Sequence, residues 1–222
     1  MPHSLEEIPL FPLPIVVFPY ANLQLHIFEA RYRQMVDRCL EFDSPFGIVM
    51  VKETGPDGLE PDPCLVGTAV RITHVQHFDD GTMNIHIHGE RRFRIRKFAE
   101  DTDPLVGMVE PVFELDYEDS PHMDALVMRA QESFKLYIEM VFSRSDFNVQ
   151  IHFPQDATAL SFQIAEHLPL DNPAKQRFLE LTDTLERLQD LIPLIERQII
   201  EAKSPIRYRV TRHHFDDWIH PN

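Results

Sequence analysis

The spacing of the apolar residues changes near residue 115, and this change limits the folds open to the chain. Before it, apolar residues recur mostly at every second position, as in strands with one buried face. After Ser120 they recur every three or four positions, as in amphipathic helices. The pattern predicts an α+β chain whose β-rich part comes first. We place the boundaries at residues 1–118 for the β-rich part, 119–203 for a helical part and 204–222 for a C-terminal tail.

Within the first part, prolines and turn residues divide the strands. The run Ile8–Val17 contains three prolines, which cannot donate to a sheet ladder, so it is predicted to be an edge strand or one with interrupted pairing. A helical period over about His26 to Phe42 predicts one helix, and Phe46–Val51 suits a buried strand. The Asp80-Gly81 step between two alternating runs predicts a β-hairpin.

Four helices are predicted in the second part. Apolar stripes indicate helices over Met123–Phe142, Ala157–His167 and Thr184–Ala202, the last with a kink at Pro193. Between them, Asp171 followed by Pro173 is a typical helix start, because Asp caps the first turn and proline fits there.

The composition favours a folded protein of the cytosol. The chain has 222 residues, 43% of them hydrophobic, and a formal net charge of −15, which on average repels nucleic acid and anionic lipid. Two cysteines do not make a disulfide framework, and the acidic, proline-rich start is unlike a signal peptide. No apolar run has the length of about 18 residues that a membrane helix needs. We therefore expect a cytoplasmic protein without a membrane partner.

Sequence motifs of catalysis are missing. The chain contains no GxxxxGK[ST], no GxGxxG and no GxSxG, and seven glycines leave little material for a phosphate-binding loop. We expect a protein that is not an enzyme and needs no cofactor.

Twelve histidines raise the alternative of a metal site. His86 and His88 would share one face of a strand, and His74 and His77 lie on the partner strand of the predicted hairpin. Because no cysteine or carboxylate cluster completes a ligand set, solvated histidines are the favoured interpretation, and a His-based metal protein or enzyme is the weaker one.

A basic run offers a second alternative, contact with an anion or nucleic acid. Its arginines alternate with Phe93 and Ile95, so a solvated strand face explains the pattern completely. No aromatic stacking set accompanies it, which makes RNA binding the less favoured alternative. The run consists of Arg91, Arg92, Arg94, Arg96 and Lys97.

Four segments resemble the N-terminal, substrate-binding domain of the Lon protease family. The opening IPLFPLPIVVFPYANLQLHIFEARYRQMV shares the family's proline-rich first strand, the Phe18-Pro19 step and the Glu29-x-Arg31 at the helix start. The resemblance continues through VGTAVRI, DGTMNIHIHGERRFRI and LPLDNPAKQRFLELTDTLERLQDLI, and covers about residues 8 to 200.

The resemblance implies a PUA-like β-barrel with one helix, followed by an α-helical bundle. It also implies a non-enzymatic module that binds unfolded or extended protein segments, and a role as an adaptor beside a protease or chaperone is one expectation that follows. Because the family's ATPase and Ser-Lys protease motifs are missing, we expect a stand-alone member, as a monomer or weak dimer.

Six residues near the first strand, loop and helix are our candidates for substrate binding, because aromatic and aliphatic side chains could stay partly exposed there. For Phe18 and Phe28, a place in the barrel core is an equally good explanation. The candidates are Pro14, Phe18, Tyr20, Leu23, Phe28 and Tyr32.

Overall fold

The computed structural model describes residues 5–51, 62–117, 120–142 and 151–203. Two compact units share the chain, the first formed by residues 1–113 and 171–180, the second by residues 114–170 and 181–222. The strands are β1 (Glu6–Leu13), β2 (Asn22–Ile27), β3 (Phe46–Met50), β4 (Val66–His77), β5 (Met83–Phe98) and β6 (Val106–Pro111). The helices are α1 (Ala30–Glu41), α2 (Pro121–Phe142), α3 (Ala157–His167), α4 (Asn172–Glu180) and α5 (Thr184–Lys203).

Five strands of the first unit close into a barrel. The strand order is β2-β5-β4-β3-β1-β6, and an additional pairing of β6 with β5 completes the ring. Only β1 and β3 run parallel, and the other pairs are antiparallel. A closed ring leaves no free edge, which protects a sheet against pairing with other chains. The expected α+β fold with a β-barrel is confirmed.

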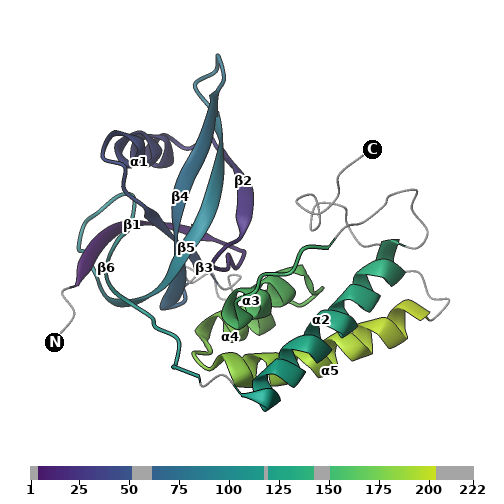
Figure 1. The fold of residues 1–222 in the computed structure, drawn as a ribbon. Coiled ribbons are helices and arrows are strands. Elements are labelled where there is room, and N and C mark those ends of the chain that lie inside the picture. The colour runs from purple at the N-terminus through teal and green to yellow at the C-terminus, as the bar shows by residue number, and fades with distance from the viewer. Residues whose placement is uncertain (1–4, 52–61, 118–119, 143–150, 204–222) are drawn as a thin grey trace, which may run out of the picture. The chain divides into compact units, whose positions relative to one another are not determined.

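The length of β5 gives this barrel an extension. Its second half, from Phe93, pairs with β6, whereas its first half, Met83–His88, pairs with β2. The β4–β5 hairpin therefore projects beyond the ring with β2 at its side (Figure 1). Its turn lies at Asp80-Gly81, as the sequence predicts, and Gly81 has a φ of 79° that favours glycine.

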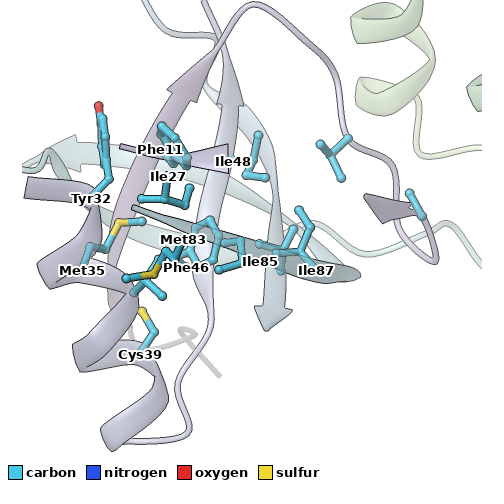
Figure 2. Close-up of a cluster of buried hydrophobic side chains, with 14 residues drawn as sticks. Phe11, Ile27, Tyr32, Met35, Cys39, Phe46, Ile48, Met83, Ile85 and Ile87 are labelled. Atoms are coloured by element: carbon cyan, nitrogen blue, oxygen red, sulfur yellow. The ribbon is translucent and has the colours of Figure 1, made fainter. Parts of the chain in front are cut away.

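Two apolar clusters stabilise the first unit. One fills the barrel and includes Leu10, Phe93 and Val109. The other lies between the projecting strands and α1, where Tyr32, Met35 and Cys39 of the helix face side chains of the sheet (Figure 2). The sheet side chains labelled there are Phe11, Ile27, Phe46, Ile48, Met83, Ile85 and Ile87.

Helix α4 belongs to the barrel unit, although the sequence analysis placed residues 171–180 in the helical part. Its polar side chains bond to backbone carbonyls of that unit: Asn172 donates to Pro14 at 2.6 Å and Gln176 to Val66 at 2.9 Å. In return Arg92 of β5 donates to the carbonyl of Leu179 at 2.7 Å. The Gln176 and Arg92 bonds satisfy donors that the contact buries, whereas the Asn172 bond lies at the surface.

Helices α2, α3 and α5 form the second unit. Their buried faces include Phe134, Phe162 and Leu188. Arg187 of α5 is fully buried and donates to Glu114 at 2.8 Å, to Ser161 at 2.7 Å and to the carbonyl of Leu181 at 2.6 Å. Among the described residues, no helix combines the length and apolar character of a membrane span.

The helix predicted from His26 begins later, at Ala30. Up to Ile27 the chain keeps the alternating burial of a strand paired with β5, and only Glu29 takes the helix N-cap position. The predicted spans of α2, α3 and α5 agree with the structure within a few residues. Pro193 lies inside α5, and the kink there stays a prediction. The whole C-terminal tail, residues 204–222, lies outside the described residues.

Candidate functional site

The six candidate binding residues separate into surface and core. Tyr20 and Phe28 are 52% and 63% exposed, Pro14 is exposed and Leu23 is half-buried. Phe18 is completely buried and Tyr32 is buried against Phe11, with ring centroids 4.1 Å apart. In this conformation Phe18 and Tyr32 are core residues that cannot touch a partner, whereas Phe28 is not a core residue.

The buried Phe18 lies in the loop between β1 and β2, and hydrogen bonds of the residues around it hold this loop against β4 and β5. The carbonyl of Val17 accepts a hydrogen bond from the buried hydroxyl of Thr68 at 2.6 Å. Tyr20 donates its N–H to the carbonyl of Gly89 at 2.7 Å, and Gly89 donates back to Ala21 at 2.9 Å. Tyr20 has a φ of 69°, a left-handed conformation that costs free energy for a side chain of this size and persists because its neighbours are fixed. The loop therefore holds the Tyr20 side chain at the surface.

At the other end of β2, three rings form a group that we call the aromatic tip: His26, Phe28 and Phe78. The His26 ring stacks against Phe28, with centroids 6.1 Å apart, and its centroid lies 6.3 Å from that of Phe78. Phe28 and Phe78 remain 63% and 39% exposed. Exposed aromatic rings held next to one another are typical of sites where proteins bind apolar side chains.

Hydrogen bonds hold the hairpin at the aromatic tip in one conformation. Asp80 accepts from the hydroxyl of Thr82 at 2.7 Å and from its N–H at 2.9 Å, and these bonds keep the pKa of Asp80 below its usual value. Arg33 of α1 donates to the carbonyl of Gly81 at 2.6 Å and so ties the turn to the helix. The aromatic tip is therefore presented on fixed backbone rather than on a loose loop.

The sequence analysis missed His26 and Phe78. Both positions carry a signal in the sequence. His26 is a ring near the end of a strand, on the face opposite the alternating apolar residues, and Phe78 is a ring beside the hairpin turn, where no core position is available. Only the pairing of β2 with β5 brings the two segments together.

The four histidines of the metal alternative do not form a ligand set. His74 and His86 are directly paired across β4 and β5, with ring centroids 5.7 Å apart. His88 instead meets Asn22 of β2, with Nδ1 and Oδ1 2.9 Å apart, and His77 is paired with Met83 at the end of the hairpin. In the part of the chain that the structure describes, no group of three or more metal-ligating side chains is present.

The basic run is not a continuous cationic surface. Arg91 forms an ion pair with Glu6 and Arg96 one with Glu110. Arg92, expected on a solvated face, is buried because α4 covers it and Leu179 accepts its hydrogen bond. Arg92 therefore cannot contact a nucleic acid in this conformation.

A family model agrees with this architecture. Residues 7–197 match the ATP-dependent protease La (LON) substrate-binding domain. Lon protease of Erwinia amylovora is 27% identical over 213 residues, and that of Escherichia coli K12 is 28% identical over 218 residues. Each match covers 93% of this chain and 27% of the relative, so the chain spans about a quarter of the length of these proteases.

Solved structures show the same fold. The Lon N-terminal domain protein from Xanthomonas campestris has a TM-score of 0.62 and 28% identity, over 85% of this chain and 98% of that one. The N-terminal domain of the Mycobacterium avium complex Lon protease has a TM-score of 0.61 at 20% identity, over 86% and 98%. From the family match and the shared fold together, the chain belongs to the LON substrate-binding domain family.

Proposed function

We propose that this protein is a non-catalytic module that binds apolar segments of unfolded or partly unfolded proteins through the aromatic tip. The observation that supports it is the pair of exposed rings, Phe28 and Phe78, fixed by Arg33 and by the Asp80–Thr82 turn. Membership of a substrate-binding family points the same way. Folded proteins bury most of their large apolar side chains, so an unfolded client chain offers Phe28 and Phe78 many more apolar partners than a folded one does.

In the cell the module would act in the cytosol as an adaptor, beside a protease or chaperone, and as a monomer or weak dimer. Binding through a few exposed rings suits clients of varied sequence, because apolar contact needs no fixed pattern of hydrogen bonds.

The test is fluorescence anisotropy with a labelled peptide in which Phe and Val alternate with Thr and Ser, here called the alternating probe. We expect saturable binding by the full chain and a loss of roughly tenfold or more in affinity for the double variant Phe28→Ala, Phe78→Ala, because such hot-spot truncations cost about 2 kcal/mol. Phe42→Ala is the matched control, since Phe42 is 68% exposed at the opposite end of α1. Equal affinities of the double variant and the wild type would refute the proposed site.

A further inference from the structure

Within the part of the chain that the structure describes, the projecting hairpin has two edges without a neighbouring strand, and they differ in protection. Among the described residues, β2 pairs only with β5, and residues 71–77 of β4 pair only with β5 as well. The remaining strands of the sheet are enclosed in the ring. Any strand from outside could therefore join the sheet at β2 or at the outer part of β4.

The outer part of β4 carries the devices with which proteins block such an edge. Its ladder with β5 is irregular between Ile72 and His74, a bulge that disturbs the edge. Arg71 adds a charge that is held in place by Asp43 at 2.8 Å and by Glu90 at 2.5 Å. Strand pairing at β4 is thus disfavoured.

Strand β2 carries none of these devices. Its six residues, Asn22–Ile27, include no charged residue and no proline, in a chain of which 26% is charged. Its register with β5 runs without a shift from Asn22 opposite His88 to Ile27 opposite Met83. In an antiparallel pair every second residue directs its N–H and C=O away from the partner strand. The outer side of β2 is therefore a regular row of backbone donors and acceptors.

Side-chain contacts at both ends tie β2 to β5. Nδ1 of His88 lies 2.9 Å from Oδ1 of Asn22, and Nδ1 of His26 lies 2.8 Å from Oδ1 of Asn84. Beyond these bonds, exposed Tyr20 precedes the strand and exposed Phe28 follows it. A rigid row of hydrogen-bonding groups about 20 Å long, flanked by aromatic rings, has the dimensions of an extended peptide of roughly six residues.

We propose that β2 binds an extended segment of another polypeptide by strand addition, so that the segment becomes the next strand beside β2. The segment supplies backbone N–H and C=O groups along β2 and apolar side chains that meet Tyr20 and Phe28. Backbone pairing gives affinity without demanding one sequence, and alternate side chains give selectivity for uncharged, alternating segments. The inference rests on the proposed function and names its mode of binding.

In the decisive experiment the peptide is chemically modified and the protein is left unchanged. Two forms of the alternating probe are N-methylated at every second amide, one form at the odd and the other at the even positions. Strand addition uses one set of amides and leaves the other in solvent, so we expect one form to lose roughly tenfold or more in affinity and the other to bind like the parent. Equal effects of the two forms overturn the proposal, because contact through side chains alone does not distinguish the sets.

Hydrogen exchange of the full chain locates the site. Saturating parent probe should slow amide exchange in Asn22–Ile27, with residues 71–77 as the internal control, and Gln24→Lys should weaken binding whereas Gln76→Lys on the β4 edge should not. Unchanged exchange in β2 overturns strand addition. Failure of the parent probe to bind at all refutes the proposed function itself, and protection of β2 that depends on protein concentration without probe would assign the edge to a second copy.

Discussion

Arg187 shows how one residue can hold the helical unit together. Its guanidinium is completely buried, lies 4.0 Å from the ring of Phe162 and bonds to Glu114, which precedes α2, and to Ser161 on α3. Burial lowers the pKa of Arg187, and the carboxylate of Glu114 opposes that shift. Removing one partner of such a pair leaves a buried charge or polar group unsatisfied, which is costlier than losing an exposed pair.

We expect Arg187→Ala to lower the free energy of unfolding of this unit by roughly 3–5 kcal/mol. Arg129→Ala is the control, because its 2.7 Å pair with Glu196 is exposed and should be worth less than about 1 kcal/mol. Urea unfolding followed by circular dichroism compares the two variants. Similar midpoints would show that the buried network adds no more than a surface pair.

The stability of this unit at alkaline pH depends on Tyr137. Burial raises the pKa of Tyr137 to about 12, against 10.0 for the ordinary side chain. The unfolded state therefore loses the phenolic proton first, so stability is fully present below pH 10 and falls as the pH rises toward 12. By pH 11 the loss should be about 1.4 kcal/mol.

Urea unfolding of wild type and Tyr137→Phe at several pH values between 9 and 11 isolates this contribution. The wild type should lose more stability than the variant over this range, since phenylalanine has no proton to release. Parallel loss in the two proteins would mean that Tyr137 ionises as readily in the folded as in the unfolded state.

At the scale of elements, the contact between β5 and the β1–β2 loop positions the surface residue Tyr20. Gly89 makes it possible: a Cβ atom there would collide with the backbone carbonyl oxygen of Phe18 and would lie 3.4 Å from Cα of Pro19. Because the obstacle is backbone and not the end of a flexible side chain, the loop itself would have to move.

Gly89→Ala should therefore destabilise the barrel unit by about 1–3 kcal/mol and weaken binding of the alternating probe by displacing Tyr20. Differential scanning fluorimetry and anisotropy measure the two effects. Gly81→Ala, at the hairpin turn where φ is 79°, is the comparison: it strains the turn but should leave hydrogen exchange of residues 18–21 unchanged. Faster exchange at residues 18–21 in the Gly81 variant as well would show that the two contacts are coupled.

Elements with a strong local pattern were predictable from the sequence. The stripe of α2, the Asp171 cap of α4, which accepts from Ala174 at 2.9 Å, and the Asp-Gly hairpin are local in origin. The start of α1 was not predictable from periodicity, because residues 26–28 fit both a helical and an alternating pattern until the pairing with β5 is known. The burial of Tyr32, and the choice between core and surface for Phe18, could not be predicted for a related reason: composition shows that a ring is apolar but not whether tertiary packing buries it.

At the scale of the whole molecule, long-range contacts decided what the sequence analysis could not. The position of α4 in the barrel unit depends on Asn172, Gln176 and Arg92 meeting carbonyl groups far away in the sequence. The aromatic tip likewise joins residues 26–28 to residue 78 across β5. The sequence predicted the class of fold and the family resemblance, whereas the proposed binding surface could be described only once the strands were paired.

The net charge of −15 should influence which peptide segments associate fastest with the protein. A field of this sign attracts basic segments over distances beyond contact, and salt screens it with a Debye length of about 8 Å at about 0.15 M. We compare two alternating probes with the same apolar residues, one with Lys and one with Glu at both ends. At low salt the Lys probe should associate faster, by on the order of tenfold, and the difference should shrink as salt is added.

Dissociation rates should differ much less between these two probes, because apolar and backbone contacts in the bound state are the same in both. Stopped-flow fluorescence separates the two rates. If the Glu probe associates as fast as the Lys probe at low salt, the field at the binding surface does not follow the net charge, and local cations such as Arg33 beside the aromatic tip dominate it. In that case Arg33→Gln should restore the preference for the Lys probe.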